Sequence, residues 1–181
     1  MARWEKYKPT HAFLVALDIS GFSKDLDPDS LLNHRMNFFN AITETYLFNK
    51  ASEDGSVKTH FLGDELRLAY QVELGASQVK QFIDEVFSRL AQLNKRVREE
   101  YRTHVKGAVL QGVVTWKTWH NCDYINGELP FKAQRWMGYL APGEVVADEE
   151  FLMALKTAGI PVSNVAQRTL ASERGYLIKT S

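Results

Sequence analysis

The chain has little cysteine and no long hydrophobic run, and both absences limit what it can be. Its 181 residues include one cysteine, Cys122, so neither an internal disulfide nor a cysteine-based zinc site can form, which suits a reducing compartment. No window reaches the ~20 apolar residues that a membrane-spanning helix needs, and the amino-terminal segment has charge without an apolar core. We therefore expect a cytoplasmic protein with no membrane partner.

An excess of charge of either sign is also missing. Lys plus Arg and Asp plus Glu each number 22, and the formal net charge is zero. Because nucleic acids and anionic membranes are recognised through a basic excess, this balance argues against both as the main ligand. The chain is the size of one domain and contains no repeat or linker, so we assign residues 1–181 to a single domain.

The hydrophobic pattern of the first fifty residues predicts a strand followed by a helix. Residues 13–17 (FLVAL) form a continuous apolar run, typical of a strand that is covered on both faces. Asp27 and Pro28 are suited to begin a helix that continues to about residue 48. The apolar stripe expected to face inward from this helix consists of Leu32, Met36, Phe39, Ile42 and Tyr46.

The rest of the chain continues the alternation. Residues 57–70 alternate apolar and polar side chains and turn at Gly63-Asp64, as in a β-hairpin. A helix is predicted from residue 77 to about 104, and a β-branched strand at 105–116. Shorter helices follow at 131–140 and 149–156, with strands at 144–148, 162–170 and 176–179. The order β-α-β-β-α-β, with additional C-terminal strands and helices, predicts an α+β fold with a ferredoxin-like core.

Two aspartates lie where predicted strands end. Asp18 follows the first strand, and Asp64 lies at the tip of the hairpin. Because the first strand of a ferredoxin-like sheet lies beside the hairpin, we expect the two to meet in space. A few carboxylate oxygens, completed by water and substrate phosphates, are what Mg²⁺ prefers. Taken alone, Asp64 could simply favour a turn and Asp18 could cap nearby amides.

Three segments of the chain carry a family resemblance. The segment LDISGFS is similar to the first metal-binding segment of class III nucleotidyl cyclases, and HFLGDE resembles their hairpin segment. The segment YINGELPFKAQRWMGYLAPGEVVADEEF resembles their substrate and transition-state segment. Their order and spacing match the family from about residue 13 to the C-terminus.

The resemblance implies that a nucleotide's 3′-hydroxyl attacks its own α-phosphate, with two divalent ions, Mg²⁺ or Mn²⁺, between the attacking and leaving oxygens. The residues implied to bind metals and phosphates are Asp18, Ile19 through its carbonyl, Asp64, Gly21, Phe22 and Ser23. Arg135 lies where the family places the arginine that stabilises the transition state. In this family the metal-binding half and the arginine half come from different protomers, so a homodimer with composite sites is implied.

The residues at the family's base-reading positions are unusual. His60 replaces the lysine of adenylate cyclases and the glutamate of guanylate cyclases, and Tyr124 stands at the partner position. Both side chains can donate or accept hydrogen bonds, so they can meet the edge of a pyrimidine. Phe131 replaces an asparagine that commonly contacts ribose. The chain therefore looks like the bacterial pyrimidine cyclases of Pycsar anti-phage defence, in which a cyclic nucleotide activates a separate effector.

Three functions follow as hypotheses. The first is a metal-dependent cyclase that converts UTP, or less favourably CTP, to its 3′,5′-cyclic nucleotide. The second is an adenylate cyclase with an atypical base pocket. The third is a non-catalytic nucleotide-binding or interaction module on the same fold, for which Phe131 is the sequence hint. On structural grounds alone, His60 could be an ordinary hairpin residue, Tyr124 a core residue and Arg135 a surface residue.

Overall fold

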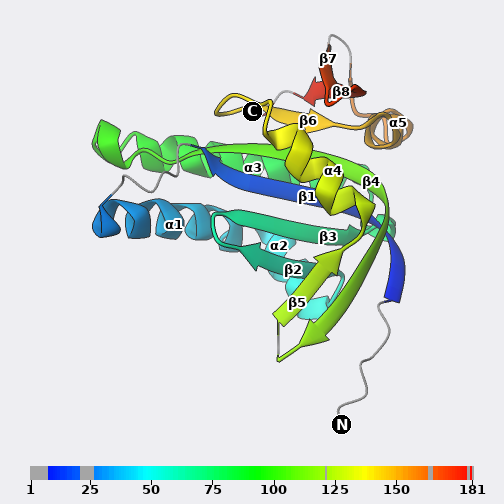
Figure 1. Ribbon diagram of the computed structural model, residues 1–181, viewed down its shortest axis with the longest axis horizontal. Coiled ribbons are helices and arrows are strands. Elements are labelled where there is room, and N and C mark those ends of the chain that lie inside the picture. Colours follow the sequence, from blue (N-terminus) through cyan, green and yellow to red (C-terminus); the bar gives the residue numbers. More distant parts are fainter. Residues whose placement is uncertain (1–7, 21–26, 121, 163–164, 179, 181) are drawn as a thin grey trace.

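The strands form one sheet with helices on both faces (Figure 1). The computed structural model describes residues 8–20, 27–120, 122–162, 165–178 and 180. The strands are β1 (Lys8–Ser20), β2 (Val57–Leu62), β3 (Glu65–Gln71), β4 (His104–Trp119), β5 (Cys122–Asn126), β6 (Val145–Ala147), β7 (Ala166–Leu170) and β8 (Glu173–Ile178). The helices are α1 (Pro28–Thr43), α2 (Tyr46–Asp54), α3 (Ala76–Asn94), α4 (Glu128–Met137) and α5 (Glu149–Thr157), with short 3₁₀ turns η1 (Val72–Leu74) and η2 (Glu99–Tyr101).

The strand order is β2-β3-β1-β4-β6-β8-β7, and β5 pairs with β4. Its first four strands, β2-β3-β1-β4, have the antiparallel arrangement of a ferredoxin-like core, which confirms the predicted fold class. β1 is central and pairs with β3 on one side and β4 on the other. A Cβ added at Gly107 in β4 would lie 2.7 Å from Leu17 Cδ2, so glycine lets these two strands approach closely.

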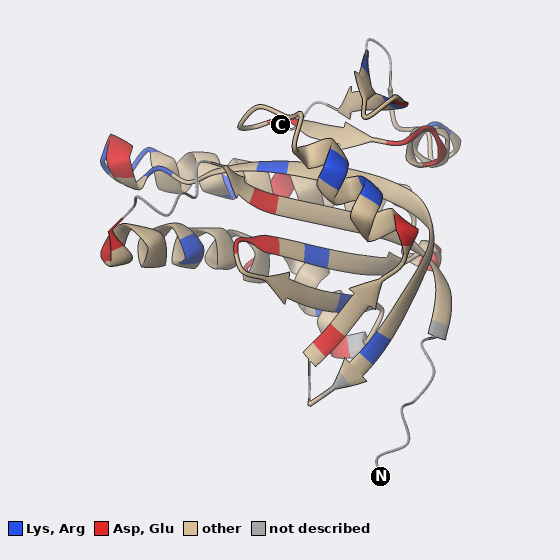
Figure 2. Cartoon of the chain, in the orientation of Figure 1, with Lys and Arg blue, Asp and Glu red and all other residues tan. Residues whose placement is uncertain are grey.

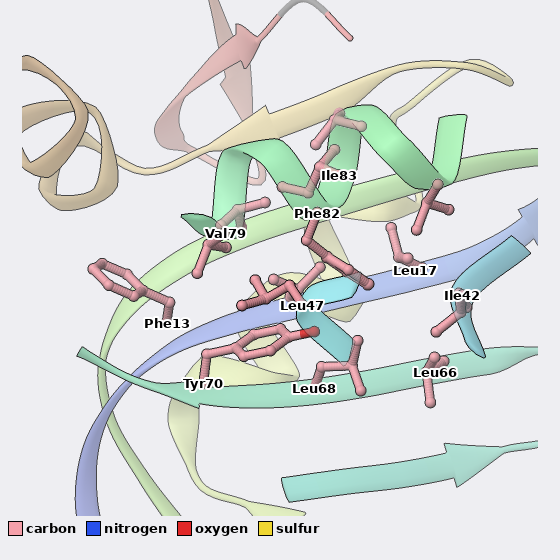
Figure 3. Packing of buried hydrophobic residues seen from close by; sticks show 14 of the residues in the cluster. Phe13, Leu17, Ile42, Leu47, Leu66, Leu68, Tyr70, Val79, Phe82 and Ile83 are labelled. Carbon is pink, nitrogen blue, oxygen red and sulfur yellow. The ribbon is translucent and has the colours of Figure 1, made fainter. Parts of the chain in front are cut away.

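Each face of the sheet has its own hydrophobic cluster because successive strand residues point to opposite sides. One face packs against α1, α2, α3 and α5 (Figure 3) and includes Leu17, Leu66 and Phe82. The other face packs against α4 and includes Leu14, Leu110 and the fully buried Trp136. Since β1 is covered on both faces, its continuous apolar run is explained.

The region predicted as one helix to about residue 48 is two helices. Asp27 caps α1 as expected, because its carboxylate accepts from the backbone nitrogens of Asp29 and Ser30. α1 ends at Thr43, and Thr45 is extended with its hydroxyl donating to the Ile42 carbonyl. α2 then begins at Tyr46.

The predicted inward stripe of α1 is partly wrong. Ile42 is buried, but Leu32, Met36 and Tyr46 are exposed by 57%, 52% and 68%. The buried side of α1 instead includes Phe38 and a polar residue, His34, whose Nδ1 lies 3.1 Å from the hydroxyl of buried Thr103. The chain therefore tolerates a polar residue inside because it has a hydrogen-bonding partner.

Other elements also differ from the prediction. α3 ends at Asn94 rather than near residue 104, because the Asn94 side chain donates to the Thr103 carbonyl and accepts from the Thr103 nitrogen. No strand is predicted at residues 122–126, yet β5 pairs there with β4. Within the described part of the chain, no helix is long and apolar enough to cross a lipid bilayer.

The orientation of α1 generates a stability prediction. Phe38→Ala removes a ring that is 1% exposed and is expected to lower the free energy of unfolding by about 3–5 kcal/mol. Met36→Ala removes a side chain that is 52% exposed, so the change should stay within about 0.5 kcal/mol. Urea denaturation followed by circular dichroism measures both. Equal losses in the two variants would contradict this orientation of the helix.

Candidate active site

The end of β1 and the tip of the β2-β3 hairpin meet at one corner of the sheet. The antiparallel register places Asp18 opposite Glu65, and the Ile19 nitrogen donates to the Asp64 carbonyl at 3.2 Å. Gly63 provides the positive φ of +69° that the tight turn requires. Figure 2 shows acidic residues at these neighbouring strand ends. The structure thus brings Asp18, Ile19 and Asp64 together, as the sequence predicts.

Two basic side chains share this corner with the acids. Arg67 forms a buried ion pair with Glu65, and the Lys106 Nζ lies 3.4 Å from Asp18 Oδ2. The pKa of Asp18 is raised to about 6, first by burial and next by the negative charge of Asp64, while Lys106 lowers it. Three carboxylates therefore face two cations. Asp64 forms no ion pair with any described residue.

The donor set at this corner fits a hard divalent cation that is shared with a substrate. Mg²⁺ is commonly bound by one or two carboxylates plus substrate phosphates. Asp18 and Asp64 supply those carboxylates, and a bound cation would oppose both causes of the raised pKa of Asp18, which are burial first and the charge of Asp64 next. The described residues contain no group of three or more His, Cys, Asp or Glu side chains that could hold a metal without such help. A metal held here would complete its coordination with ligands such as water or substrate phosphate oxygens.

A second group of predicted residues lies where β5 meets β2. The ring centroids of His60 and Tyr124 are 5.2 Å apart. His60 Nδ1 accepts a hydrogen bond from the Ile125 nitrogen at 3.2 Å, and burial lowers the pKa of His60. Accepting at Nδ1 places the proton of a neutral ring on Nε2, which then serves as a donor. Asp123 also joins the strands by accepting from the Thr59 nitrogen.

The third group lies on α4, on the sheet face opposite α1 and α3. Phe131 and Arg135 are four residues apart, so they share one face of the helix, and both are exposed. Arg135 Nη2 lies 3.1 Å from Glu173 Oε1, and Lys132 Nζ lies 2.9 Å from Glu173 Oε2. Within the described part of one chain, Arg135 has no ion pair with Asp18 or Asp64. The structure thus groups Arg135 with Phe131 but not with the acids.

Three predicted site residues are not described by the structure, and four residues near the site were not predicted from the sequence. Gly21, Phe22 and Ser23 lie outside the described residues. Sequence reasoning did not assign Lys106, the Glu65–Arg67 pair or Glu173 to the site. The one local signal was the acidic Glu65 beside Asp64. The other contacts depend on strand register between distant segments.

Solved structures share this fold at low sequence identity. The chain is similar to the guanylyl cyclase Cya2, with a TM-score of 0.72, 13% identity, and coverage of 97% of this chain and 95% of that one. The adenylyl cyclase CyaB from P. aeruginosa gives a TM-score of 0.64 with 16% identity and 98% coverage of both chains. The guanylate cyclase domain of RhGC from Catenaria anguillulae, solved with GTP, gives 0.66 with 12% identity, covering 96% of this chain and 98% of its own.

Comparisons at the sequence level add no relative, since no family model and no curated protein matches the chain. At identities of 12–16%, the likeness to the three structures concerns the fold. The chain therefore has the fold of class III nucleotidyl cyclase catalytic domains.

Proposed function

We propose that the protein is a nucleotidyl cyclase that converts a pyrimidine nucleoside triphosphate, UTP in preference to CTP, to its 3′,5′-cyclic nucleotide and pyrophosphate. The observation that carries this proposal is the meeting of Asp18 and Asp64 at one corner of a cyclase-like fold. A guanylate cyclase domain of the same fold was solved with GTP, which supports a nucleoside triphosphate as the substrate class.

In the proposed reaction, the 3′-hydroxyl loses its proton to water and its oxygen forms a bond to the α-phosphorus, while the bond from that phosphorus to the pyrophosphate oxygen breaks. Two divalent cations, Mg²⁺ or Mn²⁺, would activate the attacking oxygen and neutralise the leaving group. Asp18 and Asp64 would hold these cations through their carboxylates, and the resemblance implies that the Ile19 carbonyl would add a ligand. The backbone around Gly21, Phe22 and Ser23 contacts phosphate, as the resemblance implies.

The complete site requires two chains in this proposal. Arg135 stabilises negative charge on the phosphoryl group in the transition state. Arg135 is bound to Glu173 and not to the acidic corner of its own chain, which is compatible with the composite site that the family resemblance implies. A homodimer then contains two composite sites, each with the carboxylates of one protomer and the α4 arginine of the other.

The base preference rests on His60 and Tyr124. The Nε2 donor of His60 can bind O4 of uracil, while the Tyr124 hydroxyl accepts from N3. Cytosine can meet the same pair through N3 and its amino group, so UTP over CTP follows the family resemblance. Phe131 packs against the sugar in place of a hydrogen bond. The cyclic product then acts on a separate effector in anti-phage defence, as in the systems that the sequence resembles.

In this proposal, Lys106 helps to keep Asp18 ionised at the acidic corner. Its ammonium lies 3.4 Å from the Asp18 carboxylate and lowers the pKa that burial raises. It therefore keeps a larger fraction of Asp18 ionised near neutral pH. At 20% side-chain exposure, Lys106 is also placed to contact a phosphate oxygen once a cation is shared between the acids and the substrate.

The substrate assignment is tested with each of the four ribonucleoside triphosphates and Mn²⁺ or Mg²⁺, followed by product identification by chromatography and mass. We expect cyclic UMP as the main product. Asp64→Ala should reduce turnover by about 10²-fold or more, because it removes a metal ligand. Asp29→Ala removes an exposed carboxylate on α1 and serves as the matched control.

Other products would redirect the proposal. Cyclic AMP as the main product would favour an adenylate cyclase with an atypical pocket. Binding of a triphosphate without any product would favour the non-catalytic module.

The shared site is tested by mixing inactive chains. Asp64→Ala and Arg135→Ala are each expected to abolish turnover alone. After random reassembly, the mixture should recover roughly a quarter of wild-type activity, since half of the dimers are mixed and each has one intact site of two. A chain with both substitutions, mixed with Arg135→Ala, is the control and should recover nothing. A mixture that stays as inactive as its components would rule out composite sites.

The role of Lys106 is tested by its effect on Asp18. The pKa of Asp18 in the metal-free protein, about 6, should rise in Lys106→Met, because both the charge and the hydrogen bond of Lys106 lower it. Protons compete with the cation, so Mn²⁺ binding should weaken as the pH falls through this pKa, and at a higher pH in the variant. Carboxyl carbon shifts in a pH titration measure the pKa, with Lys80→Met as the control. An unchanged or lower pKa in Lys106→Met would disprove this role.

A further inference from the structure

A groove on the sheet face that is covered by α1, α2, α3 and α5 has no part in the proposed reaction. It encloses about 480 Å³ between the C-terminal half of α3, the segment that leads into β4 and the loop before β6. Val105, in its wall, belongs to the hydrophobic cluster that includes Leu17, Leu66 and Phe82. The next residue, Lys106, faces Asp18 on the other side of the sheet. The groove is therefore separate from the acidic corner, although both lie at the same end of β4.

One wall of the groove is apolar. It consists of Phe87, Leu90, Ala91 and Val105. Leu90 and Val105 are buried at 4% and 1% exposure, so they form a fixed floor, while Phe87 is half-buried and Ala91 is exposed at the rim. A short alkyl chain or a ring laid on this wall would remove apolar surface from water.

The other side of the groove is basic. Lys95, Arg102 and His104 line it, and none of the described lining residues is acidic. Neither Lys95 nor Arg102 forms an ion pair with another described residue. The net charge of the chain is zero, yet this groove has two cations, Lys95 and Arg102, and no acid among its described lining residues. Beside an apolar wall, this local positive charge indicates complementarity to an anion.

The backbone at Thr103, between Arg102 and His104, is held in place by hydrogen bonds. Asn94 Nδ2 donates to the Thr103 carbonyl and the Thr103 nitrogen donates to Asn94 Oδ1, both at 2.8 Å. Buried His34 contacts the Thr103 hydroxyl from behind. Arg102 and His104 flank this fixed residue, so their backbones need no rearrangement to receive a ligand, which lowers the entropy lost on binding.

We infer that this groove binds a small amphipathic anion: one carboxylate or phosphate head on an apolar body of medium-chain size. The volume is within the range of small-molecule sites, and the division into an apolar wall and a basic rim matches the two halves of such a ligand. The inference does not depend on the proposed cyclase activity, because it uses none of the residues assigned to that site.

The experiment is isothermal titration calorimetry of the full chain with decanoate and decyl phosphate, each below its micelle concentration. We expect one-to-one binding that weakens with added salt, since charged contacts near the surface are screened. Decanol and decyltrimethylammonium, which lack the anionic head, should bind at least about tenfold more weakly. Decanoate and decyl phosphate together show which head group the rim prefers.

Two variants and one control locate the ligand. Ala91→Trp places a large side chain in the groove from an exposed position and should abolish decanoate binding without lowering stability to urea. Arg102→Ala should weaken binding about tenfold or more, because a charge-assisted contact is lost. Arg96→Ala removes an equal charge from a nearby exposed residue that does not line the groove, and it should leave binding unchanged.

Several results would overturn the inference. Equal binding of decanol and decanoate would show an apolar site without a role for the basic rim. Equal losses in Arg96→Ala and Arg102→Ala would show diffuse charge attraction. Binding to phosphatidylglycerol vesicles with no affinity for free decanoate would show a membrane-facing surface in place of a small-molecule site.

Discussion

The antiparallel pairing of β1 with β3 is the constraint on which the rest of the proposed chemistry depends. It brings together Asp18 and Asp64, which are about 46 residues apart in the sequence, and fixes them through the hydrogen bond from Ile19 to Asp64. Because a slip of one residue would turn every side chain to the opposite face, the apolar covering of both sides of β1 also fixes where its terminal carboxylate lies. The hydrophobic core thus specifies the position of a charged residue at its edge.

The same sheet positions His60 and Tyr124, the residues proposed to read the base, by a different means. β5 is joined to β2 by the side chains of His60 and Asp123, which accept from backbone nitrogens across the gap. Because His60 Nδ1 is engaged in this contact, the tautomer of a neutral ring is set before any ligand arrives. A structural hydrogen bond therefore determines which hydrogen-bonding group His60 offers, and the structural and functional interpretations of this residue are compatible.

The sequence predicted those features that depend on local chemistry. The hairpin at Gly63-Asp64 and the Asp27 cap follow from turn and capping preferences. The inward face of α1 was partly wrong, because the helical period fits Leu32 and Met36 while tertiary contacts, including that of His34 with Thr103, choose another side. Lys106 was missed because only the β1–β4 register places it opposite Asp18. β5 was missed because it is short, with one fully buried apolar residue, Ile125, and because its pairing needs β4 beside it.

The exposed ion pair with Glu173 holds Arg135 in place but is weak enough for the arginine to exchange it for another partner. Glu173 also binds Lys132 at 2.9 Å, so it keeps a cationic partner when Arg135 leaves. Arg135 is 58% exposed, and an exposed pair of this kind contributes about 0.2–1 kcal/mol. In the proposed composite site, a contact to developing charge would be worth about 2.7–4 kcal/mol, so exchanging Glu173 for a phosphoryl group bound to a partner chain would be favourable in the transition state. Under this proposal, Glu173 orients the arginine without competing effectively against the substrate.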